Sequence, residues 1–344
     1  MLTFVDVCCI ICMMKTRRRV KEFDDIMHDI WNPWHGCHKC SPGCDNCYMY
    51  YLDNYRGVGG SNIVHRTGKF DYPLKKWRTG GYKIESGEMI RVNMTSDTFV
   101  PEADEWRDEM WSIIKQRSDV LFWILTKRPE RMADHMPSDW GNGYPNVIMN
   151  ITTENQKMFD KRYQYLLDLP ARHKGIVIAP MIGPVMVEKA LMSGQIEMVQ
   201  CGGENYGNPR WCRYEWVKSV SDQCRRFHVN FCWYESGSKL KMGDDRFEMP
   251  SKRDQQIAAF FSNLNLKFYD IPYDLKDPET GEPIGKREKL YNKYHCTFCA
   301  NRQVCNGCSG CGDCGNVERV SLNEIKKIEE MQLMLMKEGM KGED

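Results

Sequence analysis

The sequence has almost no excess of charge of either sign. Its 48 lysine and arginine residues are balanced by 47 aspartate and glutamate residues, which leaves a net charge of +1. This composition excludes a protein held on nucleic acid by bulk positive charge alone, although it is compatible with a local basic cleft. Hydrophobic residues make up 42% of the 344 residues, which is enough for a substantial core and excludes wholesale disorder.

A membrane-spanning run is missing as well. The N-terminal segment contains about a dozen apolar residues before its basic run, whereas a membrane helix needs roughly 20. A secretory signal places its basic residues first, so this order does not fit one. We therefore expect a cytoplasmic protein without a membrane partner. Residues 1–27 are predicted to form a disordered leader, with Met13 or Met14 as an alternative start.

Cysteine, by contrast, is abundant, and ten of the 17 cysteines fall into two groups. Secreted disulfide scaffolds spread their cysteines along a short chain, whereas these are bunched in C-x-x-C units, which is the pattern of metal ligands. A reducing compartment is therefore expected. The first group is Cys37, Cys40, Cys44 and Cys47, and the second is Cys296, Cys299, Cys305, Cys308, Cys311 and Cys314.

Between residues 28 and 240 short apolar runs alternate with helical patterns, which predicts a parallel sheet covered by helices. Six or seven such units are too few for a closed eight-stranded barrel. The predicted fold is α/β, an incomplete parallel (β/α)6-type barrel with a C-terminal cysteine-rich metal-binding extension. The predicted strands cover 89–99, 120–129, 146–155, 174–184, 196–205 and 230–237, and the longer helices 103–118, one from Glu130, 157–169 and 213–229.

After residue 240 the alternation stops. Residues 241–290 are predicted to be a surface segment and a proline-containing linker. Residues 291–320 hold the second cysteine group, and residues 321–344 are predicted to form a terminal helix capped by Ser321.

Polar residues follow four predicted strands in succession. Because ligand sites in parallel α/β folds form at the carboxyl ends of the strands, this rim is a candidate site, although any one residue could equally be a loop or capping residue. These residues are Ser96 and Asp97, Lys127 and Arg128, Thr152 to Asn155, and Gly202 to Asn205.

The spacing of the first cysteine group leaves the metal open. Cys40, Cys44 and Cys47 have the C-x3-C-x2-C spacing that can hold three irons of a [4Fe–4S] cluster. A structural zinc site usually has four protein ligands, and Cys37 could supply the fourth.

Six ordered motifs resemble those of the phage Gp37/Gp68 family, also called DUF5131. They are the cysteine motif from Trp31 to Tyr48, "TSD.F", "LTKRPERM", "TTENQ", "P.IGP" and "GGEN", within residues 28–235. That family looks like a divergent branch of the radical S-adenosylmethionine (SAM) enzymes. Its cysteines recur as C-x6-C-x2-C, so the resemblance favours Cys37, Cys44 and Cys47 as ligands, with Cys40 as a spare thiol.

The radical SAM resemblance also implies where SAM would bind. Ser96 and Asp97 would hold its amino group, and Lys127 or Arg128 its carboxylate. Thr152, Glu154 and Asn155 would bond the ribose hydroxyls, while Gly202, Gly203 and Glu204 would lie at the adenine. Asn46 stands where an aromatic residue is common in radical SAM enzymes, so Tyr48 would replace that contact.

The second cysteine group lies outside the resemblance. Cys305 to Cys314 repeat C-x2-C in a ferredoxin-like run, which favours an auxiliary [4Fe–4S] cluster. The alternatives are a zinc ribbon that pairs Cys296 and Cys299 with Cys311 and Cys314, and a tail without metal.

The predicted function is a radical SAM enzyme that uses a [4Fe–4S] cluster to cleave SAM and abstract hydrogen from a substrate. The resemblance points to a nucleic-acid base or nucleotide as substrate and to a flavodoxin or ferredoxin as electron donor. Two alternatives stay open: a peptide-modifying radical SAM enzyme, and a non-catalytic zinc or iron–sulfur protein that binds nucleic acid.

Overall fold

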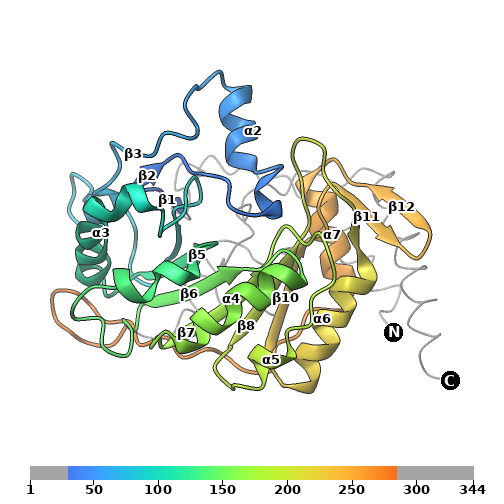
Figure 1. Cartoon of the computed structure of the whole chain (residues 1–344). Helices are drawn as coiled ribbons and strands as arrows, with labels where there is room; N and C mark the ends of the chain where they lie inside the picture. Colours follow the sequence, from blue (N-terminus) through green and yellow to red (C-terminus); the bar gives the residue numbers. More distant parts are fainter. Residues whose placement is uncertain (1–29, 285–344) are drawn as a thin grey trace, which may run out of the picture.

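The computed structural model describes residues 30–284 and shows a curled sheet of seven parallel strands, half of a barrel (Figure 1). The strands follow one another across the sheet in chain order, as expected when each crossover returns beside the previous strand. This confirms a parallel α/β half-barrel. The strands are β1 (Ile30–Trp31), β4 (Met89–Val92), β5 (Leu121–Thr126), β6 (Val147–Thr152), β7 (His173–Ile178), β8 (Met198–Gly202) and β10 (Asn230–Glu235).

The predicted leader (1–27), the cysteine-rich segment (291–320) with its six cysteines, and the terminal helix (321–344) lie outside the described residues. The metal-binding extension therefore stays a prediction.

Helices connect the strands, and their apolar faces pack on the sheet. In α3 the residues Met110, Trp111, Ile113 and Ile114 are buried, which is the one-sided pattern of an amphipathic helix. In α4 the Asn155 side chain accepts a hydrogen bond from the Met158 N–H and so caps the helix. The helices are α2 (Tyr48–Tyr55), α3 (Asp104–Gln116), α4 (Gln156–Asp168), α5 (Glu188–Leu191), α6 (Tyr214–Arg226) and α7 (Lys252–Phe261).

The two faces of the sheet bury different hydrophobic clusters. Along β5, Phe122 and Ile124 belong to the large cluster shared with the helices, whereas Leu121 and Trp123 belong to a smaller cluster on the opposite face. The alternation follows from the period of two residues in a strand. Leu275 packs in the smaller cluster, so the segment after α7 returns to cover part of that face.

Two smaller sheets flank the half-barrel. One pairs β2 (Trp34–His35) with β3 (His65–Arg66), and the other joins β9 (Cys212–Arg213), β11 (Lys239–Met242) and β12 (Asp245–Glu248). Short 3-10 helices occupy several connections: η1 (Pro42–Cys44), η2 (Tyr72–Leu74), η3 (Pro101–Ala103), η4 (Pro129–Arg131) and η5 (Ala133–His135).

Two expectations differ from the structure. The helix predicted from Glu130 is replaced by η4 and η5, because Pro129 and Pro137 bracket too few residues for a stable α-helix. Secondary structure also continues past residue 240, where β12, the end of β11 and α7 lie in the stretch predicted to be a surface segment and linker. Ser251 caps α7 by accepting from the Asp254 N–H, a start signal that the surrounding charged residues obscured.

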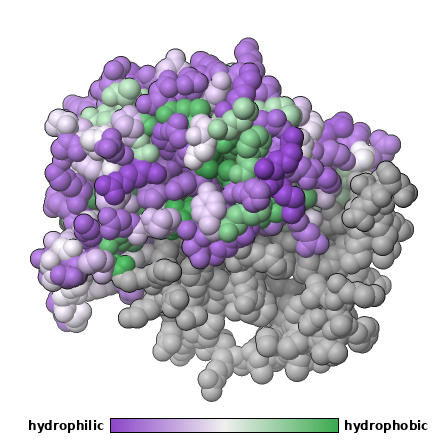
Figure 2. Space-filling view, turned by 90° about the horizontal axis from the view of Figure 1, so that it is seen from below, coloured by the Kyte–Doolittle hydropathy of each residue, from purple (hydrophilic) through white to green (hydrophobic). Residues whose placement is uncertain are grey.

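Within residues 30–284 every helix is too short or too polar to cross a bilayer. The described residues that are seen from below are mostly hydrophilic, with hydrophobic side chains grouped among them (Figure 2).

Candidate functional site

The first cysteine group lies in a loop that we call the cysteine loop, residues 36–47, between β2 and α2. Gly36 has a φ of +92°, and a Cβ at this position would overlap the Ile63 carbonyl, so glycine is required where the loop leaves β2. The chain then turns through η1, which contains Cys44, and Cys47 is the residue that precedes α2.

The cysteine loop rests on the carboxyl ends of several strands of the sheet. After β4, the Ser96 hydroxyl donates to the Gly36 carbonyl over 2.5 Å. After β6, Glu154 Oε1 accepts from the Gly43 N–H at 3.0 Å, and after β8, Glu204 Oε2 accepts from Asn46 Nδ2 at 2.8 Å. The structure therefore gathers rim residues from separate strands against one loop.

Arg128, which follows β5, connects the cysteine loop to Asp97. Its guanidinium forms an ion pair with Asp97 at 3.3 Å and donates to the His38 carbonyl at 2.8 Å and to the Cys37 sulfur at 3.8 Å. The positive charge of Arg128 thus lies between a buried carboxylate and the first thiol of the loop. Such a hydrogen bond to sulfur favours the thiolate form of a cysteine.

The carboxylate of Asp97 is fully engaged within the chain. It is 5% exposed and accepts hydrogen bonds from Thr126 Oγ1 at 2.7 Å, from the Lys127 N–H at 2.8 Å and from the Phe99 N–H at 2.9 Å, besides its ion pair with Arg128. Asp97 therefore fastens the ends of β4 and β5 to each other. A ligand amino group at this carboxylate would have to share acceptors that are already used.

The carboxylates of Glu154 and Glu204 are also paired within the chain. Glu154 is completely buried and forms an ion pair with Arg162 at 2.7 Å, while Glu204 is 4% exposed and forms one with Arg210 at 2.5 Å. Burial tends to raise the pKa of both carboxyls, but their arginine partners and hydrogen bonds outweigh it and hold each pKa below its usual value. Both groups are thus anionic anchors at neutral pH.

Lys127 differs from its neighbours, because its ammonium group forms no hydrogen bond or ion pair with any described residue. The side chain is half-buried at the rim. Burial lowers its pKa, but the negative potential of Cys44, Glu154, Cys47 and Asp97 outweighs burial and raises it. Lys127 is therefore a charged donor that the described chain leaves available to a ligand.

The glycines of "CGGEN" are explained by packing. A Cβ at Gly202 would overlap the ring of Tyr234, and one at Gly203 would overlap the backbone of Ser236. Both glycines let β10 and the residues after it approach closely.

The remaining predicted site residues lie at the same rim. Thr152 is fully buried, and its hydroxyl has no hydrogen-bond partner among the described residues. Asn155 is the cap of α4, and Tyr48, the first residue of α2, donates from its hydroxyl to the Met94 carbonyl.

The four thiols of the cysteine loop are in different environments. Cys40 is exposed and Cys44 is buried, and a hydrogen bond between their side chains raises the pKa of Cys40 and lowers that of Cys44. Burial raises the pKa of Cys37 to about 11, with Arg128 acting in the opposite direction. Within residues 30–284 no three His, Cys, Asp or Glu side chains converge closely enough to form a ready metal site.

Thiolates are nevertheless the ligand type that iron–sulfur clusters take. Four thiols lie on one short loop, and Arg128 and Lys127 place two positive charges beside them, which would offset the negative charge of a thiolate cluster. Cys37, Cys44 and Cys47, with Cys40 as the alternative, are the residues that would hold it.

Buried polar residues also lie in the middle of the strands, where no predicted site residue lies. Arg91 on β4, Asn150 on β6 and Gln200 on β8 are each at most 8% exposed. A Cβ at Gly175 of β7 would overlap the Asn150 side chain, so Gly175 makes room for it. The signal was an arginine, asparagine or glutamine inside each largely apolar run, which marks a face of the sheet that is not purely hydrophobic.

Fold and site together define a class: an α/β half-barrel protein with a cysteine loop fastened over the carboxyl ends of its strands. The chain belongs to the DUF5131 family, described as a protein of unknown function, which matches residues 25–271. Comparison with curated proteins and with solved structures gave no match.

Proposed function

We propose that this protein is a radical SAM enzyme whose cysteine loop carries a [4Fe–4S] cluster. The observation that carries the proposal is the attachment of a four-cysteine loop to residues after β4, β5, β6 and β8, at the carboxyl rim of a parallel half-barrel. Substrates and cofactors of parallel α/β folds bind at this rim, so the cysteine loop lies where such a group would be held.

The chain's own residues have two tasks in this proposal. Arg128, Glu154 and Glu204 hold the cysteine loop in place, while Lys127 supplies a free ammonium group for the carboxylate of SAM. When bound, the reduced cluster would supply the electron that cleaves SAM to methionine and a 5′-deoxyadenosyl group that takes hydrogen from the substrate. A flavodoxin or ferredoxin is the class of protein that would deliver the electron, and a nucleic-acid base or nucleotide is the proposed substrate.

A second candidate function is a non-catalytic metal-cluster protein that binds nucleic acid. The observation that favours it is that the carboxylates of Asp97, Glu154 and Glu204 already have hydrogen-bond and ion-pair partners within the chain. Residues that only hold a loop in place would have such partners. A peptide-modifying radical SAM enzyme uses the same site and differs only in its substrate.

The test is to prepare the protein anaerobically, reconstitute it with iron and sulfide, reduce it, add SAM and measure 5′-deoxyadenosine. In protein whose C-terminal cysteines are replaced by serine, we expect acid-labile sulfide and formation of 5′-deoxyadenosine, and we expect both to be lost in Cys44→Ala. Cys224→Ala, which removes a buried thiol of α6 far from the loop in sequence, is the matched control. Bound zinc without sulfide would overturn the proposal, and a cluster that never cleaves SAM would support the second candidate.

A further inference from the structure

The three-stranded sheet of β9, β11 and β12 has one face on the core and one face outward, and β11 and β12 lie at one edge of the molecule (Figure 1). Leu240 of β11 is paired in register with Cys212 of β9, and both are 1% exposed. Phe247 of β12, opposite Leu240, packs against the same hydrophobic cluster. Because side chains alternate along a strand, the neighbours of these residues point to the outer face.

Three cations form a row across this outer face. Lys241 of β11 is paired in register with Arg213 of β9 on one side and with Arg246 of β12 on the other. Lys239, two residues before Lys241, points to the same face and adds a fourth positive charge. Like charges directly opposite one another destabilise a sheet, so such a row is unfavourable unless an anion lies on it.

Carboxylates of the chain compensate only part of this charge. In the part of the chain that the structure describes, one of the four cations has an ion pair, Lys241 with Asp244 at 3.7 Å. Glu248 of β12 is the other carboxylate of the outer face, whereas Asp245 is paired with Met242 and so belongs to the opposite face. The whole chain has a net charge of +1, so the excess of positive charge on this face is local.

Indole rings lie among the cations. Lys239 Nζ is 5.7 Å from the ring centroid of Trp211, and Arg246 Cζ is 5.6 Å from it. Arg213 Cζ is 5.7 Å from the ring centroid of Trp216. Both indoles are only half-buried, so part of each ring is open to solvent. The outer face therefore combines flat aromatic surfaces with positive charge, which is the combination that holds the bases and phosphates of a nucleic-acid strand.

The basic outer face begins next to the cysteine loop. Arg210, which precedes Trp211 in the chain, donates to the Pro42 carbonyl at 2.9 Å and forms an ion pair with Asp45 at 3.3 Å. Its guanidinium is also paired with Glu204 after β8. Trp211 is therefore one residue away from a side chain that contacts both the cysteine loop and the carboxyl rim of the half-barrel.

We infer that the outer face of the β9–β11–β12 sheet binds single-stranded nucleic acid, with the row of cations on its phosphates and Trp211 against a base. Arginine matches phosphate oxygens through paired N–H donors, and lysine adds a point charge. A duplex keeps the faces of its bases inside its own stack, and an acidic peptide offers carboxylates without rings, so the indole favours a single strand. The inference concerns binding and does not rest on the proposed function.

The experiment measures binding of labelled DNA and RNA single strands of about 12 nucleotides to the full chain, without SAM or reductant, by fluorescence anisotropy at several salt concentrations. At least one of the two strands is expected to bind. Arg213→Ala and Arg246→Ala should each lower the affinity about threefold or more and reduce the slope of log affinity against log salt by about one, because each removes a phosphate contact. Trp211→Ala should lower the affinity about fivefold or more and leave the slope unchanged, since it removes stacking and no charge.

Both arginines are exposed, so their variants should fold, and a melting curve checks every variant. Trp211→Phe keeps a flat ring and should recover part of the affinity lost in Trp211→Ala. Arg78→Ala, at an exposed arginine between η2 and β4, is the matched control and should bind like the parent protein. The difference between the DNA and RNA affinities shows whether the 2′-hydroxyl contributes to binding.

Three outcomes would overturn the inference. They are unchanged affinity and salt slope in both arginine variants, binding of a duplex of the same sequence as tightly as the single strand, and equally tight binding of polyglutamate, which would indicate a surface for acidic peptides. Because the measurement needs neither cluster nor SAM, its failure is distinguishable from failure of SAM cleavage. Formation of 5′-deoxyadenosine by a protein that binds no single strand would leave the proposed function intact and remove this surface.

Discussion

The backbone N–H of Gly43 donates a hydrogen bond to Glu154 Oε1 over 3.0 Å and so joins two positions 111 residues apart in the chain. A Cβ at Gly43 would lie only 3.0 Å from the Glu154 carboxyl carbon, so a larger residue here would push the carboxylate away. The other oxygen of Glu154 is held by Arg162 at 2.7 Å. One buried carboxylate therefore connects the cysteine loop to α4 and to the end of β6.

Replacing Glu154 with alanine should destabilise the protein strongly. The change leaves the Arg162 guanidinium buried without its partner, which costs about 3–5 kcal/mol. It also frees the Gly43 N–H, so the cysteine loop should become more mobile. Urea unfolding measures the free energy of unfolding, and amide hydrogen exchange measures the loop. Glu130→Ala, at an exposed carboxylate, is the control and should change little; equal losses in both variants would contradict the anchoring role.

Glu154 and Glu204 should also set part of the pH dependence of stability. Their pKa values are held below the ordinary 4.5, since Arg162 and Arg210 outweigh the effect of burial. A carboxyl whose pKa is lower in the folded state stabilises the fold above its unfolded pKa and loses that contribution as pH falls through the folded pKa. We expect the free energy of unfolding to decline progressively below about pH 4.5, with a shallower decline in Glu204→Gln.

The control for this pH dependence is Glu130→Gln, which should keep the slope of the parent protein because Glu130 is exposed. Urea unfolding at several pH values between neutral and acidic conditions gives the comparison. Identical slopes in Glu204→Gln and the parent would show that the Glu204–Arg210 pair contributes nothing to acid stability.

Lys127 and Arg128 are adjacent in sequence but should respond differently to substitution. Arg128 contacts Asp97 and the cysteine loop, so Arg128→Ala should reduce both the free energy of unfolding and cluster retention. Lys127 has a free ammonium group, so Lys127→Ala should leave both nearly unchanged and weaken SAM binding by about tenfold or more. Calorimetry with SAM and thermal unfolding separate the two effects. Unchanged SAM affinity in Lys127→Ala would remove this residue from the proposed site.

The sequence alone predicted the strand series because strands buried on both faces consist of near-continuous apolar runs, as in residues 121–126. The failures have local physical causes. Pro137 shortens the segment after β5 to two 3-10 turns, and the charged start of α7 hid its apolar residues. The polar rim was predicted, but its role in fastening the cysteine loop was not, since contacts such as Glu154 with Gly43 depend on the curvature of the sheet.

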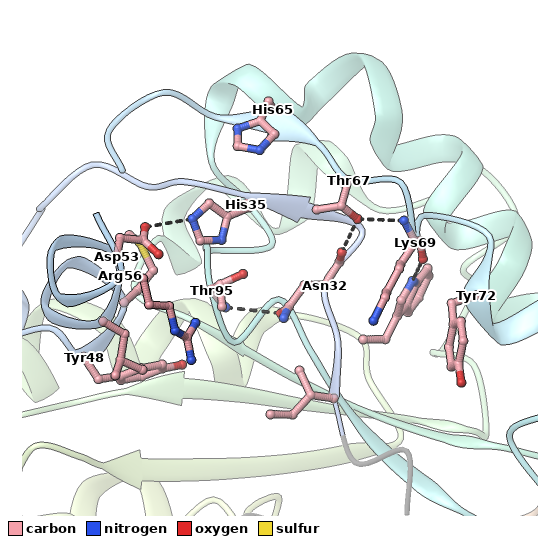
Figure 3. Close-up of a pocket in the computed structure, with 14 residues that line it drawn as sticks. Asn32, His35, Tyr48, Asp53, Arg56, His65, Thr67, Lys69, Tyr72 and Thr95 are labelled. Carbon is pink, nitrogen blue, oxygen red and sulfur yellow. Dashed lines mark hydrogen bonds and ion pairs between the residues drawn. The ribbon is translucent and has the colours of Figure 1, made fainter. Parts of the chain in front are cut away.

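A pocket between β1, α2 and the chain around β3, shown in Figure 3, was missed for the same reason. His35, Asp53, Arg56 and Lys69 have no motif spacing, and they line one pocket only because the fold brings β2, α2 and the chain after β3 to it. A single sequence carries no signal for such a cluster of unrelated positions.

The last prediction concerns which thiols would hold the cluster. Cys37 lies against Arg128, whose Nη1 is 3.8 Å from the Cys37 sulfur, and hydrogen bonds to ligand sulfurs are typical of cluster sites. Cys40 is exposed and its side chain interacts only with Cys44 among the thiols, by a hydrogen bond. We therefore expect Cys37→Ala to lose the cluster and SAM cleavage, and Cys40→Ala to retain most of both.

The physical reason is that removal of a true ligand leaves one iron without a thiolate and makes the cluster labile, whereas removal of a spare thiol deletes only a small side chain. Cluster absorbance and the rate of 5′-deoxyadenosine formation are measured for each single variant. The C-terminal cysteines are replaced by serine in every protein compared, so that metal bound there does not mask the result. Loss of the cluster in Cys40→Ala, together with activity in Cys37→Ala, would show that the three ligands are Cys40, Cys44 and Cys47. Partial activity in both would show that either thiol serves as the third ligand and would contradict a fixed role for Cys37.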